Sequence, residues 1–577
     1  MLTRLLKDYL RPYRTLIVGV TILLLIQSIA SLYLPSLNAD LINNGVSKGD
    51  ITYIWHTGLV MLAVSALVMG SSIYLGYLSS KASMAFGADL RKAVFESVER
   101  FSTRELGKFG APSLITRNTN DVQQVQMVLF MGLTMMLGAP ITGIGASIMA
   151  IRTDRKLSLL LLVTIPIMSL LIWLLLRRIV PLFRVVQIKI DRINLVLREQ
   201  ISGVRVIRAF VKTRYEEARF AEASYDLMGT SLSVTRTFAL MFPVLMLILN
   251  ITSVAVIWFG GKLVNSGEMQ IGNLTAFLAY IMQILSSVMM AVMMSLMIPR
   301  AAASADRIQE VLMTDSSVID PINPVLPTAR TGTIEFKGVE FRYPGAEHPV
   351  LSDITFTAKP GQFTAIVGST GSGKSTLVNL IPRFIDATNG EIILDGVPIK
   401  EQSLDSVWKD VGLVPQRAFL FGGTVADNLR FGKEDATEAE MWAALEIAQA
   451  KDFVTELPER LEALVSQGGT NFSGGQRQRL AIARAVIKEP KIYILDDSFS
   501  ALDFTTDAKL RVALENSAKG AALIVVAQRV STILEADQIL VLDQGKLVGI
   551  GKHHELMSKC ETYKEIVLSQ LSPEEAS

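Results

Sequence analysis

Residues 363–376 read Phe-Thr-Ala-Ile-Val-Gly-Ser-Thr-Gly-Ser-Gly-Lys-Ser-Thr, an apolar run that leads into a glycine-rich loop. The run 363–367 predicts a buried strand, and the apolar residues at 377–380 predict a helix after the loop. A strand, a loop of the form G-x-x-x-x-G-K-[ST] and a helix together allow backbone N–H groups to converge on phosphate oxygens. This stretch therefore predicts a phosphate-binding loop in an α/β domain.

The loop also carries side chains suited to a nucleoside triphosphate and its metal ion. Lys374 can place a positive charge at the β- and γ-phosphates, and the Ser375 hydroxyl can bind Mg²⁺. The start of the following helix adds its dipole. We therefore expect ATP and Mg²⁺ to bind here. The remaining candidate ATP contacts in the loop are Gly368, Ser369, Thr370, Gly371, Ser372, Gly373 and Thr376.

Four further sequence features fit the same chemistry. Asp496 ends the hydrophobic strand 492–496, where a carboxylate can bind Mg²⁺. Gln416 is expected to bridge the metal and a water molecule, and Tyr343 is expected to stack on the adenine. The stretch Ser473, Gly474, Gly475 and Gln476 opens a predicted helix, whose free N–H groups suit the γ-phosphate of ATP.

The composition indicates membrane spans ahead of this domain. Of the 577 residues 50% are hydrophobic and 19% are charged, and the mean hydropathy is +0.39. The formal net charge of +2 gives no reason to expect nucleic acid as a partner. Cys560 is the only cysteine, so no internal disulfide can form. A membrane helix needs about 20 mostly apolar residues, and six stretches qualify: 15–35, 54–79, 127–150, 157–176, 238–261 and 273–298.

The spacing of these stretches predicts a topology. The gaps 80–126 and 177–237 are long and basic, and their apolar residues recur at the spacing of a helix. The other gaps are short. The sequence therefore predicts a multi-pass protein of the cell membrane (plasma or inner membrane). The positive-inside rule places both long gaps, both termini and the ATP domain on its cytoplasmic side. Three basic residues in the short gap after the third stretch oppose this topology: Arg152, Arg155 and Lys156.

The predicted domains are a transmembrane domain over 1–314, a proline-containing linker over 315–332 and an ATP-binding domain over 333–577. The motif order resembles that of the ATP-binding-cassette (ABC) transporters, and six preceding spans with two long cytoplasmic loops resemble the exporter type. The resemblance covers essentially the whole chain and is most specific at 473–479. The motifs are, in order, Tyr343, Gly368–Thr376, Gln416, Phe472–Gln476, Asp496, Ser500–Asp503 and Gln528.

The resemblance implies an all-α six-helix transmembrane domain fused to an α/β P-loop nucleotide-binding domain, that is, a half-transporter. It implies an ATP hydrolase coupled to transport across the lipid bilayer. It also implies that two such chains sandwich two ATP molecules. Each ATP would lie between the phosphate loop of one chain and Ser473–Gln476 of the other.

Two positions depart from the family pattern. The family has glutamate after the magnesium aspartate and histidine at the switch position, where this chain has Asp497 and Gln528. Aspartate is one methylene shorter, and glutamine can donate a hydrogen bond but cannot carry a proton. The chain therefore resembles the subunit with the degenerate site in heterodimeric bacterial multidrug ABC exporters. A second homologous half-transporter would be its partner, and a homodimer with slow but working sites is the alternative.

The transported substrate is expected to be a small hydrophobic or amphipathic compound. Met290, Met293, Met294 and Met297 recur at helical spacing in the sixth stretch, where flexible thioethers suit a permissive pocket. Packing or lipid contact explains these methionines equally well, and a lipid or peptide exporter is the alternative function. A non-transport ABC ATPase acting on nucleic acid or ribosomes would lack the fused spans.

Two loop segments resemble those that dock exporter spans onto the ATP-binding domains. They are Ser113–Arg117 with Asp121, and Gly203–Phe210 with Glu216. Docking of this kind would transmit motion between rigid bodies. Solvated charged helices are the simpler interpretation of both.

Overall fold

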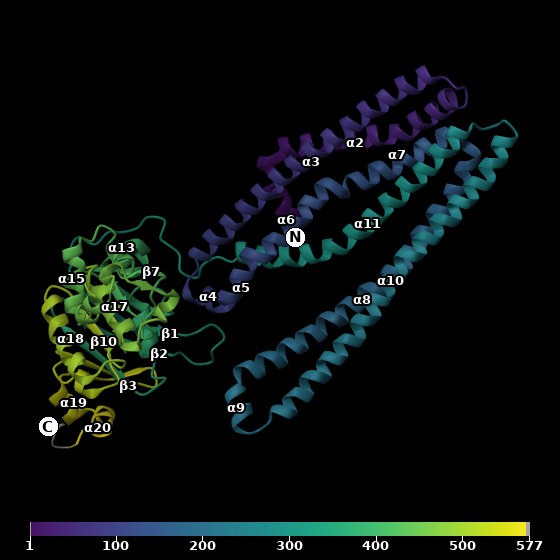
Figure 1. The fold of residues 1–577 in the computed structure, drawn as a ribbon. Helices are drawn as coiled ribbons and strands as arrows, with labels where there is room; N and C mark the ends of the chain where they lie inside the picture. Colours follow the sequence, from purple (N-terminus) through teal and green to yellow (C-terminus); the bar gives the residue numbers. More distant parts are fainter. Residues whose placement is uncertain (1, 573–577) are drawn as a thin grey trace. The chain divides into compact units, whose positions relative to one another are not determined.

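The computed structural model describes residues 2–572, without the side chains of Leu176, Val180, Arg184, Phe242, Met293, Ser295 and Leu296. The expectation for Met293 therefore lies outside the described side chains. The chain forms two compact units, one from 2–99 with 112–314 and one from 100–111 with 315–572 (Figure 1). The fold prediction is confirmed: long apolar helices form the first unit, and an α/β domain forms the second.

Six of the described helices are long and apolar enough to cross a membrane: Arg11–Val46, Ile51–Glu99, Ala111–Thr153, Arg155–Ser202, Thr213–Asn265 and Ile271–Leu312. Each contains one predicted stretch. The elements of the first unit are α1 (Leu2–Tyr9), α2 (Arg14–Asp40), η2 (Leu41–Val46), α3 (Ile51–Glu99), α5 (Ala111–Thr116), η3 (Arg117–Asp121), α6 (Val122–Met131), η4 (Gly132–Met136), α7 (Gly138–Thr153), α8 (Arg155–Ser202), α9 (Val204–Ala209), α10 (Thr213–Asn265) and α11 (Ile271–Leu312).

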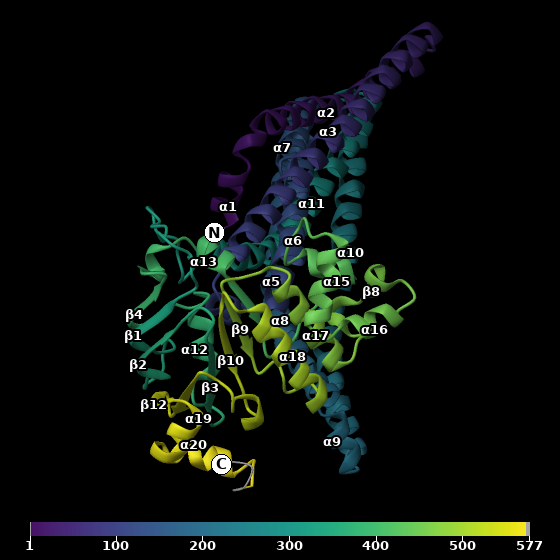
Figure 2. The same cartoon turned by 90° about the vertical axis from the view of Figure 1, so that its left-hand side faces the viewer.

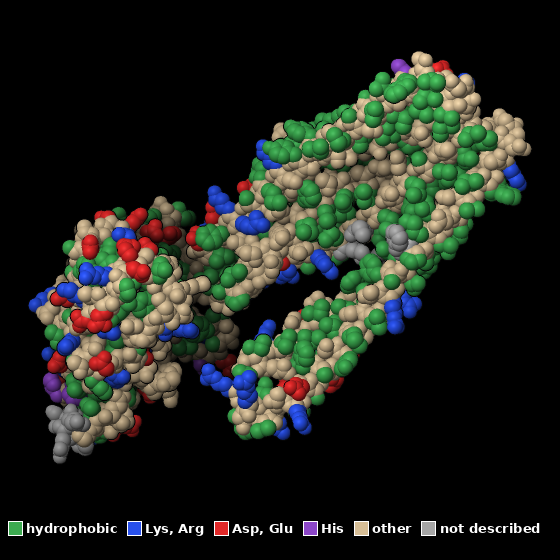
Figure 3. Space-filling view, in the orientation of Figure 1, with side chains coloured by type: hydrophobic (Ala, Val, Ile, Leu, Met, Phe, Trp, Pro, Cys, Tyr) green, Lys and Arg blue, Asp and Glu red, His purple; other side chains and the backbone are tan. Residues whose placement is uncertain are grey.

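The helices continue well past the predicted membrane stretches, as the helical spacing in the long gaps predicts. α10 has 53 residues, about 80 Å at the rise of an α-helix, against about 30 Å for a hydrocarbon core. α8 and α10 run side by side and are joined through the short helix α9 (Figures 1 and 2). Hydrophobic side chains cover much of these helices, and Lys and Arg side chains gather around the α9 end (Figure 3).

A proline inside α2 shapes the contact between α2 and α11. Proline has no N–H, so Pro35 leaves the carbonyl of Ser31 without its intrahelical donor. The Gln283 side chain of α11 donates to that carbonyl at 3.3 Å, and the buried Tyr280 hydroxyl donates to the carbonyl of Leu32 at 3.1 Å. A polar group inside a membrane span needs a partner. α11 thus supplies the donor that the proline removes from α2.

We expect Pro35 and Gln283 to be energetically coupled. Replacing Gln283 by Leu should destabilise the wild-type protein, because the Ser31 carbonyl then has no donor. In a Pro35→Ala background an intrahelical N–H returns, so the same replacement should cost less, by about 1 kcal/mol. Unfolding in detergent micelles of the two single variants and the double variant measures this difference. Strict additivity would contradict the expectation.

The second unit contains a mostly parallel sheet, an antiparallel sheet and a two-stranded antiparallel sheet, β7-β8. The larger sheet has the strand order β12-β11-β3-β10-β9-β6, in which only β12 is antiparallel to its neighbour; the four-stranded antiparallel sheet has the order β2-β1-β4-β5. The strands are β1 (Ile334–Phe341), β2 (Leu351–Ala358), β3 (Phe363–Gly368), β4 (Asn389–Leu394), β5 (Val397–Pro398), β6 (Val411–Val414), β7 (Gly423–Thr424), β8 (Leu464–Val465), β9 (Ile492–Asp496), β10 (Ala522–Val526), β11 (Gln538–Asp543) and β12 (Lys546–Gly551).

Helices cover one face of the larger sheet, and helices together with the four-stranded antiparallel sheet cover the other. The central strands of the larger sheet, β3, β9 and β10, are buried almost throughout because alternate residues enter two different cores: Ala365 and Val367 lie in one, and Ile366 lies in the other. The helices of the second unit are α4 (Thr103–Phe109), α12 (Lys374–Leu380), α13 (Leu404–Asp410), α14 (Val425–Arg430), α15 (Glu438–Ile447), α16 (Lys451–Glu456), α17 (Gly474–Val486), α18 (Phe504–Ser517), α19 (His553–Lys559) and α20 (Glu561–Leu568).

Candidate ATP-binding site

Strand register brings three predicted site segments to one edge of the parallel sheet. Val526 of β10 pairs with Ile366 of β3 on one side and with Asp496 of β9 on the other. The loops that follow these three strands therefore leave the sheet at the same level. They carry the phosphate loop, Asp496 with Asp497, and Gln528.

The phosphate loop needs glycine at two positions for steric reasons. Gly368 has φ 153°, and a Cβ there would lie 2.1 Å from the carbonyl oxygen of Leu542. Gly373 has φ 99°, and its Cβ would lie 2.7 Å from Cδ2 of Leu351. At Gly368 the clash is with backbone, so any side chain there would displace the loop. At Gly373 the left-handed φ itself disfavours any other residue.

Lys374 folds back over the loop that it follows. Its Nζ donates to the carbonyl oxygens of Gly368 and Ser369, each at 2.8 Å. Burial lowers the pKa of Lys374, and the carboxylates of Asp496 and Asp497 partly oppose that shift. The ammonium group thus lies within the loop whose backbone would surround the phosphates.

The residues present fit a magnesium–nucleotide complex. The Ser375 hydroxyl lies 3.4 Å from Oδ1 of Asp496, and these are oxygen ligands of the kind that Mg²⁺ prefers. Burial raises the pKa of Asp496. Ser372 Oγ, in the loop itself, is buried and has no hydrogen-bond partner among the described residues. A phosphate oxygen would satisfy it, since buried polar groups are normally paired. The described residues hold no cluster of three or more His, Cys, Asp or Glu side chains suited to a metal.

Asp497 is held by two neutral amides. The Gln528 side chain donates to Oδ2 of Asp497 at 2.7 Å, and the Gln416 side chain donates to the same oxygen at 3.1 Å. The backbone of Asp497 has φ 50°, a left-handed conformation that aspartate tolerates better than most side chains do. Asp497 therefore contacts both Gln528 and Gln416, the other two predicted catalytic-site residues.

Tyr343 lies next to the phosphate loop, at the end of β1. Its hydroxyl is 3.4 Å from Oγ1 of Thr376, and its ring packs edge-on against Phe341 with 4.8 Å between the centroids. Nearly half of its surface is exposed. The aromatic face is thus available to a base bound beside the loop.

The Ser473–Gln476 segment lies on another element and is not bonded to the phosphate loop. Ser473 is the N-cap of α17: its hydroxyl accepts from the N–H of Gln476, whose side chain accepts from the N–H of Ser473. Ser473 and Gly474 are exposed. Among the described hydrogen bonds, none joins this segment to residues 368–376. Gly474 lines a pocket of about 610 Å³ that Gln416 also lines.

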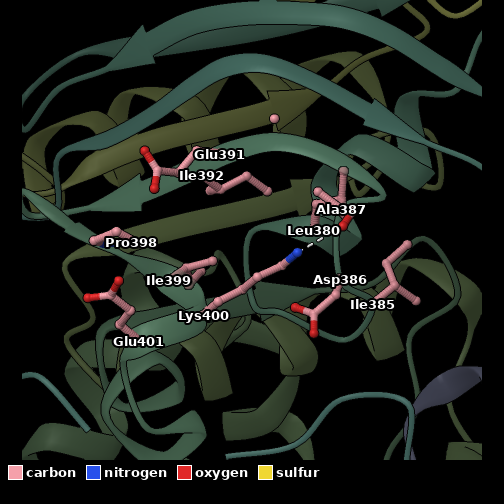
Figure 4. A pocket seen from close by; sticks show the side chains of 11 residues that line it. Leu380, Ile385, Asp386, Ala387, Glu391, Ile392, Pro398, Ile399, Lys400 and Glu401 are labelled. Carbon is pink, nitrogen blue, oxygen red and sulfur yellow. Dashed lines mark hydrogen bonds between the residues drawn. The ribbon is translucent and has the colours of Figure 1, made fainter. Parts of the chain in front are cut away.

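A smaller pocket lies apart from these residues. Its volume is about 210 Å³, and it lies between the end of α12, β4 and the turn at Ile399–Glu401 (Figure 4). The Lys400 side chain points to the carbonyl of Ala387 and donates to it at 3.0 Å. The one ammonium group lining the pocket is therefore already bound.

Arg117 and Asp121 of the first predicted docking segment contact α11. Arg117 donates to Oε2 of Glu310 at 2.8 Å, and Asp121 accepts from Ser304 and Arg307 of α11 at 2.9 and 2.8 Å. These side chains brace α11 within the first unit. α4, which precedes them, belongs to the unit that contains the ATP-binding domain.

Glu105 of α4 is a residue that the sequence reasoning missed. Its buried carboxylate accepts from the hydroxyl of Ser102 at 2.6 Å and from the backbone N–H and hydroxyl of Ser317, each at 3.2 Å. Burial raises the pKa of Glu105, but the hydrogen bonds from Ser102 and Ser317 outweigh it and hold the pKa below the ordinary 4.5. The capping-box pattern Ser-x-x-Glu at 102–105 was a signal that could have identified it.

Comparisons with known proteins place the chain in a family. The family model of the ABC transporter transmembrane region matches residues 17–288, and the family model described as ABC transporter matches residues 351–500. An uncharacterized ABC transporter ATP-binding protein of Mycobacterium tuberculosis is 49% identical over 99% of this chain and 98% of its own. The chain belongs to the ABC transporter family.

Two further relatives carry functional names. A Bacillus subtilis protein named for multidrug export is 30% identical over 98% of both chains. An ATP-dependent lipid A-core flippase of Pseudomonas aeruginosa is 33% identical over 90% of this chain and 85% of its own. The fold matches a bacterial Atm1-family ABC exporter solved with ATP bound, with a TM-score of 0.80, 24% identity, and coverage of 96% of this chain and 97% of that one. The protein is an integral membrane ABC exporter half-transporter whose ATP hydrolysis drives transport.

We expect Glu105→Ala to release α4 from the segment at Ser317. Backbone amides near 103–109 and 317–318 should exchange hydrogen several-fold faster, because the carboxylate that joins the two segments is gone. In the wild type this contribution is full above about pH 4.5, the ordinary Glu pKa, and is lost as the pH falls through the lowered pKa. Hydrogen exchange of both proteins across this range is the measurement. Equal exchange at neutral pH would contradict the assignment.

Proposed function

We propose that this chain is the weakly hydrolysing half of a heterodimeric exporter. Its own phosphate loop binds ATP with Mg²⁺ and hydrolyses it slowly, and its Ser473–Gln476 segment completes the ATP site of a second, homologous half-transporter. The observation that carries the proposal is the set of contacts around Asp497.

Those contacts make Asp497 a poor base. A general base must approach within about 2.6–3.2 Å of the proton that it takes. The Asp497 carboxylate is one methylene shorter than glutamate, and its Oδ2 already accepts from Gln528 and Gln416. Gln528 can donate to a γ-phosphate but cannot carry a positive charge there. Binding and slow turnover follow from the same set of side chains.

A second chain is needed to complete the sites. Ser473 and Gly474 are exposed, and no hydrogen bond among the described residues joins them to the phosphate loop of the same chain. α9, at the tip of the α8–α10 pair, buries none of its residues, and the apolar Phe210 and Val211 beside it are 71% and 86% exposed. Both surfaces suit burial against a partner subunit. A homodimer with slow sites remains the alternative.

For the membrane, we propose that both termini and the ATP-binding domain are cytoplasmic in the cell membrane. The basic residues of 80–126 and 177–237 favour this orientation. Of the three basic residues that oppose it, Lys156 forms an ion pair with Glu268, which reduces the net positive charge of that outer turn.

For the substrate, we propose a small hydrophobic or amphipathic compound. The relative named for multidrug export supports this class. Met290 of α11, 39% exposed, offers adaptable apolar surface, whereas Met294 is buried. The lipid A-core flippase relative makes a lipid the second candidate. Export of fluorescent amphipathic dyes and of labelled lipid from proteoliposomes separates the two.

We expect the pair of substitutions Asp497→Glu and Gln528→His to raise hydrolysis at this site by about 10²-fold, the order of a general-base contribution. Asp497→Glu alone should give less, because its longer side chain at φ 50° has no charged switch residue beside it. Single-turnover release of phosphate from the purified full chain in nanodiscs measures both. High turnover by the unpartnered wild-type chain would reject the proposal.

We expect Gly474→Gln to separate the two ATP sites of the complex. A Cβ at Gly474 meets nothing within 4 Å, so the free chain should fold normally. The longer side chain would occupy the space facing the partner's ATP, so turnover of the co-purified complex should fall at least tenfold. ATP binding by this chain alone should be unchanged, as fluorescent ATP titration would show. Unimpaired turnover of the complex would contradict the assigned role of 473–476.

A further inference from the structure

The loop that follows β10, residues 527–530, carries Gln528 and is called the switch loop. On one side it is bound by Gln570, which lies in the turn after α20. The side-chain N–H of Gln570 donates to the carbonyl of Gln528 at 2.8 Å. The backbone N–H of Val530 donates to the side-chain oxygen of Gln570 at 2.9 Å. One amide side chain thus uses its donor and its acceptor to hold the backbone on both sides of Arg529.

The backbone that presents Gln570 is itself anchored. Gln570 lies in the turn after α20, where the N–H groups of Gln570 and Leu571 donate to the carbonyl of Val567 at 3.0 and 2.9 Å. Val567 and Tyr563 are fully buried in the core that also contains Val530. α20 contacts β11 of the parallel sheet. The turn therefore offers the switch loop a fixed amide.

The opposite side of the switch loop faces the ATP-site residues. The Gln528 side chain donates to Oδ2 of Asp497 at 2.7 Å. The Arg529 guanidinium donates to the carbonyls of Ser500 and Leu502, each at 3.2 Å. The carbonyl and the side chain of Gln528 share one Cα. Holding the carbonyl therefore limits the directions in which the side-chain amide can point.

We propose that Gln570 is a positioning residue for ATP binding and hydrolysis, acting through Gln528. Its two hydrogen bonds hold the switch loop so that the Gln528 amide faces Asp497 and the space beside the phosphate loop. This inference rests on the proposed function to the extent that Gln528 contacts the γ-phosphate of ATP.

The test is a double-mutant cycle in the full-length chain in nanodiscs, read by the dissociation rate of a fluorescent ATP analogue with Mg²⁺. Gln570→Ala should speed dissociation several-fold, up to about tenfold, since two hydrogen bonds that orient the loop are lost. Gln570→Glu keeps the acceptor for Val530 but not the donor for Gln528, so its effect should be intermediate. Lys564→Ala, an exposed change on α20, is the matched control and should leave the rate at the wild-type value.

The background variant Gln528→Ala distinguishes positioning from general support of the fold. If Gln570 acts through Gln528, Gln570→Ala should have no further effect in that background. An equal effect in both backgrounds, or no effect in the wild type, would overturn the inference. Brisk hydrolysis by the unpartnered wild-type chain would instead reject the slow-site proposal. The same cycle would then be read from kcat, with the same requirement for non-additivity.

Discussion

The alignment of three parallel strands is the constraint on which the ATP site depends. β10 lies between β3 and β9, and Val526 pairs with Ile366 and Asp496 at the same level. The phosphate loop, the two consecutive aspartates and the switch loop therefore begin at one edge of the sheet, as ligand-binding loops do in parallel α/β sheets. A shift of one residue in either pairing would turn the side chains of that strand to the opposite face.

At that edge, the side chains at the catalytic positions hydrogen-bond to one another. The carboxylate of Asp497 accepts hydrogen bonds from the neutral side-chain amides of Gln528 and Gln416, and neither amide brings a positive charge to it. Gln570 supports the same arrangement from behind the loop. Asp497 and Gln528, the two departures from the family pattern, are therefore parts of one hydrogen-bonded group. The proposed slow hydrolysis follows from this group as a whole.

In the membrane unit, polar groups inside the helices are also paired with side chains of neighbouring helices. Pro35 removes a donor from α2, and Gln283 of α11 replaces it. Asp121 is buried in the π-helical segment η3 and forms an ion pair with Arg307 of α11, the helix that also carries Gln283. At both of these irregular points a side chain of α11 supplies the partner. Such contacts fix how the helices pack, because apolar side chains alone gain little from one another in lipid.

The sequence alone determined those features of this protein that depend on neighbouring residues and their spacing. The strand, loop and helix at 363–380, the six apolar stretches and the unusual Asp497 and Gln528 could all be identified from neighbouring residues and their spacing. The length of the helices beyond the bilayer also followed from periodicity in the long gaps. Only the tertiary structure decided which distant groups meet. Glu105 binds Ser317 across 212 positions, and Gln570 reaches the switch loop across 42. Periodicity describes one element at a time, whereas a hydrogen bond between two elements depends on how their packed faces bring the two side chains within 3 Å or so of each other.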